Sequence, residues 1–171
     1  MSRVRLLARD EAPPLARGWY RADGTASALL RSLANAPDVL ETLWPFVLQT
    51  SDEGSIDLAM KELVVVRVSR LNRCRYCLAS HRPAAIEVGV PAEQVAIVCD
   101  EAPLDGLPPR ERAIVEWVDA FVLDPAGITD ELVAGVLDYL RDDQLIELSA
   151  LIGATEFLNK YCIAFDLPLP K

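Results

Sequence analysis

The chain has 171 residues, of which 51% are hydrophobic, and a formal net charge of −9. The length suits one domain with a sizeable core, and the acidic balance argues against nucleic acid or an anionic membrane surface as a partner, because both select basic proteins. No stretch approaches the apolar span of a membrane helix, and the N-terminus does not look like a signal peptide. Four cysteines, two of them closely spaced, suit a reducing compartment, so we expect a cytoplasmic protein.

Helical periodicity dominates the chain, and alternating β patterns are absent, which predicts an all-α fold. Residues 1–24 contain Pro, Arg and Gly without clear periodicity, and we expect an extended arm of the kind that wraps a neighbouring subunit. Residues 25–171 are expected to form a single helical domain. Start and stop signals predict helices over 26–35, 38–49, 56–70, 73–87, 91–98, 110–123, 130–141 and 142–165.

Particular residues set the expected ends of these helices. Thr25 and Thr129 are suitable N-caps for the first and seventh helices. Pro45 lies inside the second predicted helix and is expected to kink it or end it early. Gly89 is expected to follow the end of the fourth helix.

One stretch, from Lys61 to His81, holds the only histidine and the only close cysteine pair. On a helix, Cys74, Cys77 and His81 fall at i, i+3 and i+7 and share one face. A free thiol has a pKa of about 8.5, so it needs a base or a positive neighbour to become a thiolate near neutral pH. His81 is placed to serve Cys77, and Cys74 is placed to close a disulfide on it. These are the parts of a thiol redox centre.

Glu62 is the second candidate group, because it is a carboxylate in an apolar run and therefore needs a partner if buried. On one unbroken helix Glu62 and Cys77 would be about 22 Å apart along the axis. If Glu62 serves the thiols, the chain must turn between them, near residues 71–73. We expect Asn72 to be the N-cap of the cysteine helix, whose N-terminal dipole would lower the thiol pKa.

The string E-x11-C-x2-C-x3-H, formed by Glu62, Cys74, Cys77 and His81, resembles the alkylhydroperoxidase D / carboxymuconolactone decarboxylase family, in particular its redox-active, peroxidase-type branch. The resemblance implies an all-helical fold and assembly into homo-oligomers, trimers or hexamers. It also implies that Cys77 attacks a hydroperoxide, that Cys74 resolves the product, and that Glu62 and His81 relay protons. Some peroxidases of the family carry a second histidine just before the second cysteine. This chain has Tyr76 there, whose hydroxyl could donate a hydrogen bond to a thiolate or peroxide oxygen.

We therefore expect an antioxidant enzyme, a peroxidase that reduces hydroperoxides with electrons from an external dithiol and needs no metal or organic cofactor. Two other functions stay open. The first is a carboxymuconolactone decarboxylase-like lyase, in which His81 and Glu62 perform acid–base chemistry. The intact cysteine pair argues against it. The second is a non-enzymatic thiol switch, in which disulfide formation changes assembly or partner binding.

A zinc site is the competing interpretation of the cysteine pair. Cys74 and His81 would lie about 10 Å apart along a helix axis, which is awkward for one ion. No second C-x-x-C pair or spare histidine supplies a fourth ligand. We therefore predict no metal.

A shift of 85 residues pairs Glu62 with Glu147 and Cys77 with Cys162, which suggests an internal repeat of a helical pair. In the second copy Asn159 stands in place of Cys74. Cys162 lacks a neighbouring thiol and base in the sequence, and we predict that it is a core residue, as free cysteines often are.

Overall fold

In the computed structural model, which describes residues 2–170, all regular secondary structure is helical, which confirms the all-α prediction. Three short 3-10 helices supplement the α helices: η1 (Pro14–Trp19), η2 (Leu104–Gly106) and η3 (Pro125–Gly127). The α helices are α1 (Ala28–Leu33), α2 (Pro37–Ser51), α3 (Leu58–Leu71), α4 (Arg75–Glu87), α5 (Ala92–Val98), α6 (Pro109–Leu123), α7 (Asp130–Leu137) and α8 (Asp142–Ala164).

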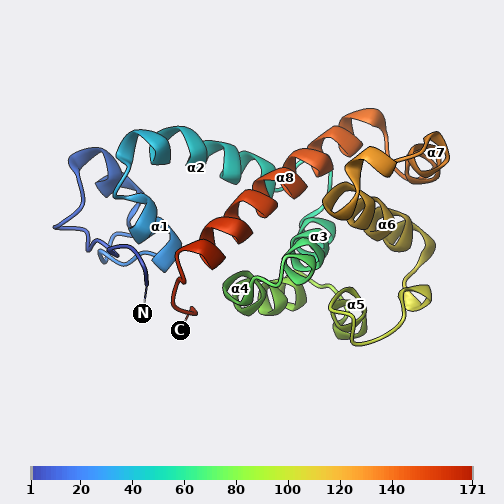
Figure 1. Ribbon diagram of the computed structural model, residues 1–171, viewed down its shortest axis with the longest axis horizontal. Helices are drawn as coiled ribbons and strands as arrows, with labels where there is room; N and C mark the ends of the chain where they lie inside the picture. The colour runs from blue at the N-terminus through green and yellow to red at the C-terminus, as the bar shows by residue number, and fades with distance from the viewer. Residues whose placement is uncertain (1, 171) are drawn as a thin grey trace.

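The central element is α3, which packs against α4, α5, α6 and α8 (Figure 1). Its N-terminus is capped by Asp57, whose carboxylate accepts a hydrogen bond from the Met60 N–H at 2.8 Å. Val64, Val66 and Val68 are fully buried in the main core, which also contains the inner faces of α5, α6 and α8. A helix that is apolar on nearly all sides is stable only when neighbours cover it, and α3 satisfies that condition.

A second apolar cluster lies at the other end of the molecule, where α1, α2 and the last turns of α8 meet. The N-terminal segment joins it through the buried side chains of Leu7, Ala16 and Tyr20. The Tyr20 hydroxyl donates to the Leu7 carbonyl at 2.9 Å, and the Arg3 N–H donates to the Phe165 carbonyl at the same distance. The arm therefore packs on its own chain and includes η1, whereas the sequence predicted an extended segment.

The start of the first helix and the end of the seventh helix differ from the prediction. The N-cap of α1 is Ser27, whose hydroxyl accepts a hydrogen bond from the Leu30 N–H. The Thr25 hydroxyl instead donates a hydrogen bond to the Asp23 carboxylate at 2.7 Å. Thr129 does cap α7, as predicted, although that helix ends at Leu137 rather than near residue 141.

The second helix, α2, continues through Pro45 to Ser51, so the proline does not end it early, and a kink at Pro45 stays a prediction. Proline removes one backbone N–H from the helical ladder. Leu40 and Val47 are buried on either side of it, and this packing stabilises both halves of the helix.

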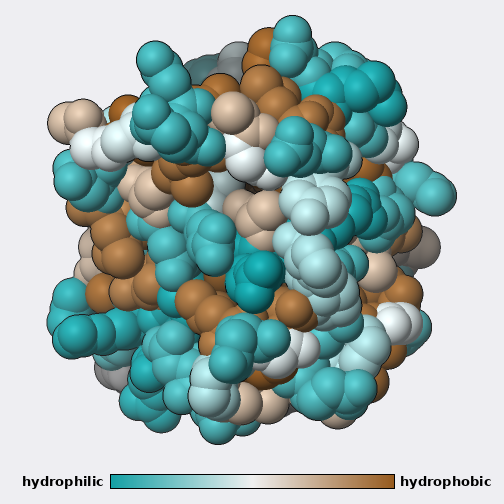
Figure 2. Space-filling model, turned by 90° about the vertical axis from the view of Figure 1, so that its right-hand side faces the viewer, coloured by the Kyte–Doolittle hydropathy of each residue, from teal (hydrophilic) through white to brown (hydrophobic). Residues whose placement is uncertain are grey.

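No helix within residues 2–170 has both the length and the apolar character needed to cross a membrane. Hydrophilic and hydrophobic residues are intermixed on the face that Figure 2 presents, at the end of the molecule near α7.

Candidate active site

The turn between α3 and α4 places the cysteine pair. Asn72 still has helical backbone angles and ends α3, and Arg73 follows with a left-handed φ of 58°. The Cys74 N–H then donates to the Ser69 carbonyl at 2.9 Å, which closes the turn. The N-cap of α4 is therefore Cys74 and not Asn72, because Asn72 is used to terminate the preceding helix.

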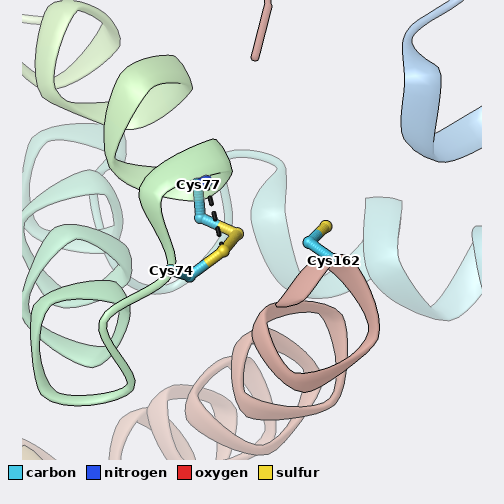
Figure 3. A group of neighbouring side chains, drawn as sticks. All are labelled: Cys74, Cys77 and Cys162. Carbon is cyan, nitrogen blue, oxygen red and sulfur yellow. Dashed lines mark hydrogen bonds between the residues drawn. A yellow bond between two sulfur atoms is a disulfide. The ribbon is translucent and has the colours of Figure 1, made fainter. Parts of the chain in front are cut away.

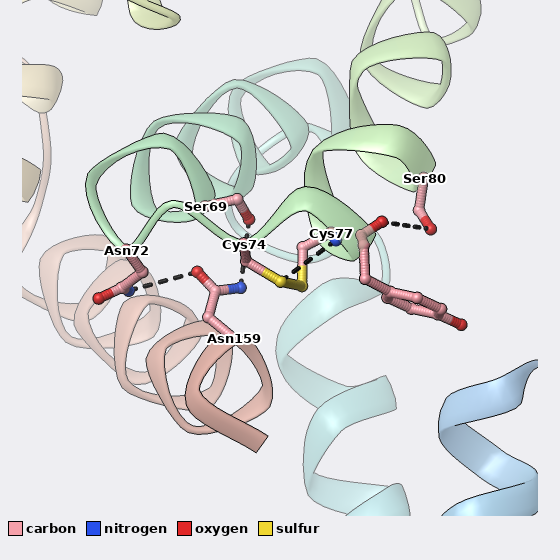
Figure 4. The surroundings of a disulfide bond; sticks show 7 residues. Ser69, Asn72, Cys74, Cys77, Ser80 and Asn159 are labelled. Atoms are coloured by element: carbon pink, nitrogen blue, oxygen red, sulfur yellow. Dashed lines mark hydrogen bonds between the residues drawn. A yellow bond between two sulfur atoms is a disulfide. The ribbon is translucent and has the colours of Figure 1, made fainter. Parts of the chain in front are cut away.

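Cys74 and Cys77 form a disulfide across the first turn of α4, with their Cα atoms 5.4 Å apart (Figure 4). The Cys74 Sγ also accepts a hydrogen bond from the Cys77 N–H at 3.3 Å. A sulfur in this position caps the positive end of a helix, which favours its thiolate form after reduction. Both residues are buried: Cys74 is fully buried and Cys77 is 6% exposed.

Asn159 of α8 holds this turn in place (Figure 4). Its amide donates to the Ser69 hydroxyl at 3.2 Å, and its carbonyl accepts from the Asn72 amide at 3.2 Å. A buried polar side chain needs such partners. The sequence analysis did not assign Asn159 to the site. The only signal for it was the repeat alignment, which set Asn159 opposite Cys74.

Glu62 and His81 meet across the interface between α3 and α4. The His81 Nδ1 lies 2.8 Å from the Glu62 Oε2. Both side chains are partly exposed, at 38% for His81 and 22% for Glu62. His81 lies one helical turn beyond Cys77 on α4, and Glu62 reaches His81 from α3.

Tyr76 is the fifth residue singled out from the sequence. Its side chain is buried, and burial raises the pKa of its hydroxyl, although hydrogen bonds with the Leu29 backbone and the Ser27 side chain lower it. These contacts tie α4 to α1. Donation by Tyr76 to a thiolate or peroxide oxygen stays a prediction.

Cys162 of α8 lies beside the disulfide, although the sequence analysis predicted a core cysteine without a neighbouring thiol. It is buried as predicted, but its sulfur and those of Cys74 and Cys77 all lie within 4.8 Å of one another (Figure 3). Burial raises the pKa of the Cys162 thiol to about 12, so the thiol stays protonated near neutral pH. The packing of α4 against α8 brings this thiol to the site.

A cavity of about 300 Å³ adjoins the sulfur atoms. Its walls include Cys74, Tyr76, Cys162 and the C-terminal segment 166–169, together with Arg73 and Arg75. The space exceeds the volume of a few water molecules. An organic molecule of moderate size can therefore approach Cys74 and Cys162 from this side.

Comparison with known proteins identifies similar sequences and structures. Residues 37–120 match the sequence profile of the carboxymuconolactone decarboxylase family. Over 113 residues the chain is 26% identical to the uncharacterized protein YdfG of Bacillus subtilis (strain 168). This alignment covers 66% of this chain and 77% of YdfG.

Solved structures share the fold. A peroxidase-related protein with an alkylhydroperoxidase AhpD core, from Ralstonia eutropha JMP134, superposes with a TM-score of 0.84 at 18% identity, over 99% of this chain and 93% of that one. The debrominase Bmp8 in complex with 2,3,4-tribromopyrrole gives a TM-score of 0.79 at 21% identity, over 99% and 94% of the two chains. At these identities the likeness shows the fold.

Proposed function

Because residues 37–120 belong to the carboxymuconolactone decarboxylase family and the fold is that of the AhpD core, we propose that this protein is a thiol-dependent peroxidase that reduces hydroperoxides. The observation that carries the proposal is the Cys74–Cys77 disulfide at the start of α4, one helical turn from the His81–Glu62 pair. A dithiol and an acid–base pair are what two-electron reduction of a peroxide requires.

In the first step, the Cys77 thiolate attacks the terminal oxygen of the hydroperoxide. The O–O bond breaks, Cys77 becomes a sulfenic acid, and the alkoxide leaves. His81 takes the proton from the Cys77 thiol and returns one to the leaving oxygen. Glu62 accepts the hydrogen bond of Nδ1–H, which leaves Nε2 as the nitrogen that exchanges protons with the site.

In the second step, the Cys74 thiol condenses with the sulfenic acid, which forms the disulfide and releases water. An external dithiol then reduces the pair and is itself oxidised to a disulfide. Attack at Cys77 expels Cys74 as a thiolate, and the Cys77 N–H that caps Cys74 stabilises this leaving group. No metal or organic cofactor takes part in this cycle.

Assembly and location form part of the same proposal. Large apolar side chains are exposed on α2 and α8, including Phe46 at 47% and Ile146 at 71%. Apolar surface of this kind supports homo-oligomer formation, and we propose a trimer or hexamer. The dithiol cycle also fits a reducing, cytoplasmic environment.

The decisive experiment is a thiol titration of the reduced protein before and after one equivalent of hydroperoxide, with peptide mapping of the product. Loss of two thiols as the Cys74–Cys77 disulfide, with consumption of the peroxide, is the expected result. If both thiols stayed free while the peroxide persisted, the peroxidase proposal would fail. The lyase function, with His81 and Glu62 as acid and base, would then come first.

A second candidate is reduction of a carbon–bromine bond, supported by the cavity beside Cys74 and by the likeness to the debrominase Bmp8. In that reaction two thiols would supply two electrons, the carbon would gain a hydrogen, and bromide would leave. The same dithiol and the same disulfide serve both reactions. Anaerobic incubation of the reduced protein with a bromopyrrole, followed by measurement of bromide, distinguishes this substrate class from a hydroperoxide.

A further inference from the structure

The thiol of Cys162 has no part in the peroxidase cycle, yet it lies among the redox sulfurs. Cys74 and Cys77 come from the start of α4, and Cys162 comes from the last two turns of α8 (Figure 3). The three sulfur atoms lie within 4.8 Å of one another, and all three residues are buried. Three thiolates around one ion at about 2.3 Å would lie about 4 Å apart, so small side-chain adjustments would allow all three to bind one ion.

We propose that the dithiol form of this protein binds arsenite through Cys74, Cys77 and Cys162. The site would exist only after reduction of the disulfide, because oxidation removes two of its three ligands. It does not depend on peroxide turnover, since the proposal concerns the reduced protein at rest.

Three thiolates form a neutral complex with a trivalent element that binds thiols, such as arsenic(III). Arsenous acid and three thiols are all neutral, and they combine into a neutral trithiolate with release of three waters, so three S–As bonds form as three O–As and three S–H bonds break. Arsenic stays trivalent and no electrons are exchanged. A neutral product suits this location, because burying an uncompensated charge is costly.

The surroundings of Cys162 point the same way. Burial is the dominant influence on its pKa, and no arginine lowers that pKa. Arg73 and Arg75 line the neighbouring cavity but are exposed, so solvent screens their charges. Apart from the Cys77 N–H that caps Cys74, the protein therefore offers little stabilisation to an anionic complex at these sulfurs.

The net charge of the complex disfavours zinc and monovalent copper at these three sulfurs. A zinc trithiolate would carry one negative charge and would need a fourth ligand. The only histidine of the chain, His81, is hydrogen-bonded to Glu62. A copper(I) trithiolate would carry two negative charges.

Access comes from the cavity of about 300 Å³, whose walls include Cys74 and Cys162. Arsenous acid has only four heavy atoms and fits this space. The released waters can leave by the same route.

The test uses the full chain reduced with a phosphine, with sodium arsenite and phenylarsine oxide as probes. Phenylarsine oxide is the matched control ligand, because its arsenic binds only two thiols. We expect one arsenic per chain and three sulfur neighbours by X-ray absorption. Cys162→Ser should weaken arsenite binding roughly 100-fold, the gain expected from a third tethered ligand, and should leave phenylarsine oxide binding unchanged.

Cys99→Ser is the matched control variant, because Cys99 is the other free cysteine and is also buried. It should bind both probes as the unmodified protein does. If Cys162→Ser misfolds, Cys162→Ala and the sulfur count in the unmodified protein decide the question. Two sulfur neighbours, no binding by the reduced protein, or equal arsenite affinity after loss of Cys162 would each overturn the proposal.

Discussion

A hydrogen bond of 2.8 Å between the His81 Nδ1 and the Glu62 Oε2 joins α3 to α4. The two side chains can meet only because the chain turns sharply between these helices. Glu62 lies near the start of α3 and His81 lies in the middle of α4. In the proposed cycle the carboxylate orients the imidazole and leaves Nε2 as the nitrogen that exchanges protons with the site. This relationship makes His81 the base of the proposed cycle and Glu62 its positioning residue.

His81→Ala should slow the oxidation of Cys77 by hydroperoxide by about 100-fold, the usual contribution of a general base. Glu62→Gln should cause a smaller loss, because the imidazole remains but its orientation is less well held. The measurement is the rate of thiol loss after rapid mixing of reduced protein with hydroperoxide, recorded from pH 5 to pH 9. A base that acts on the thiol changes the pH profile, whereas a purely structural residue does not.

Glu87→Gln supplies the control for this series, since Glu87 is an exposed carboxylate at the end of the same helix. It should leave the rate and the pH profile unchanged. An unaltered profile in His81→Ala would remove His81 from the mechanism.

Cys74→Ser should trap the sulfenic acid on Cys77 after one equivalent of hydroperoxide, because the resolving thiol is gone. The Cys162 thiol is near, but its pKa of about 12 leaves it protonated and a poor nucleophile. A dimedone adduct on Cys77, located by mass spectrometry, is the expected product. The opposite pattern, a stable adduct on Cys74 in Cys77→Ser and none in Cys74→Ser, would reverse the two roles.

Most of the helical fold could be predicted from periodicity and end signals, because an amphipathic segment such as 110–123 has few alternatives. Segment 56–70 is apolar on nearly all sides, and its length and flanking helix formers favour a helix. Local competition decided the details that were wrong. Ser27 outcompeted Thr25 as a cap because Thr25 was already bonded to Asp23. Asn72 ended one helix and left Cys74 to begin the next.

The residues from the end of the chain could not be predicted by local reasoning. Cys162 and Asn159 reach the site only because α8 packs against α3 and α4, a contact between segments about 85 residues apart. The shift that pairs Cys77 with Cys162 was the one hint of this in the sequence. Whether it reflects a true repeat stays a prediction.

Arg67→Met should destabilise the protein by about 2–3 kcal/mol, because hydrogen bonds to charged groups of this kind contribute that much. The buried guanidinium donates to Asp119 and to Asp100, each at 2.6 Å, and thereby ties α3 to α6 and to the end of α5. Urea unfolding followed by circular dichroism gives the free energy.

Arg112→Met is the control for that measurement. Arg112 is exposed and meets Glu116 only at 4.0 Å, so its loss should cost no more than about 0.5 kcal/mol. Equal costs for the two variants would show that the buried network contributes no more than a surface pair.

Glu147→Gln should make the protein less stable at neutral pH and less sensitive to acid. The carboxylate lies 2.6 Å from the buried Lys61 ammonium and accepts a hydrogen bond from Ser55. Partial burial raises the pKa of Glu147, but the hydrogen bonds and the charge of Lys61 outweigh it and hold that pKa below its ordinary 4.5.

A pKa that is lower in the folded state means that the stabilisation is complete above pH 4.5 and is lost as the pH falls through the folded value. The gap in unfolding free energy between the unmodified protein and Glu147→Gln should therefore be about 3 kcal/mol at pH 7, the cost of leaving Lys61 unpaired, and should shrink on acidification. Urea titrations at pH 7, 5, 4 and 3 measure this gap. Glu93→Gln, which alters an exposed carboxylate of α5, is the control and should show no such convergence. A gap for Glu147→Gln that stayed constant with pH would mean that the Glu147 carboxylate has the same pKa in the folded and unfolded states.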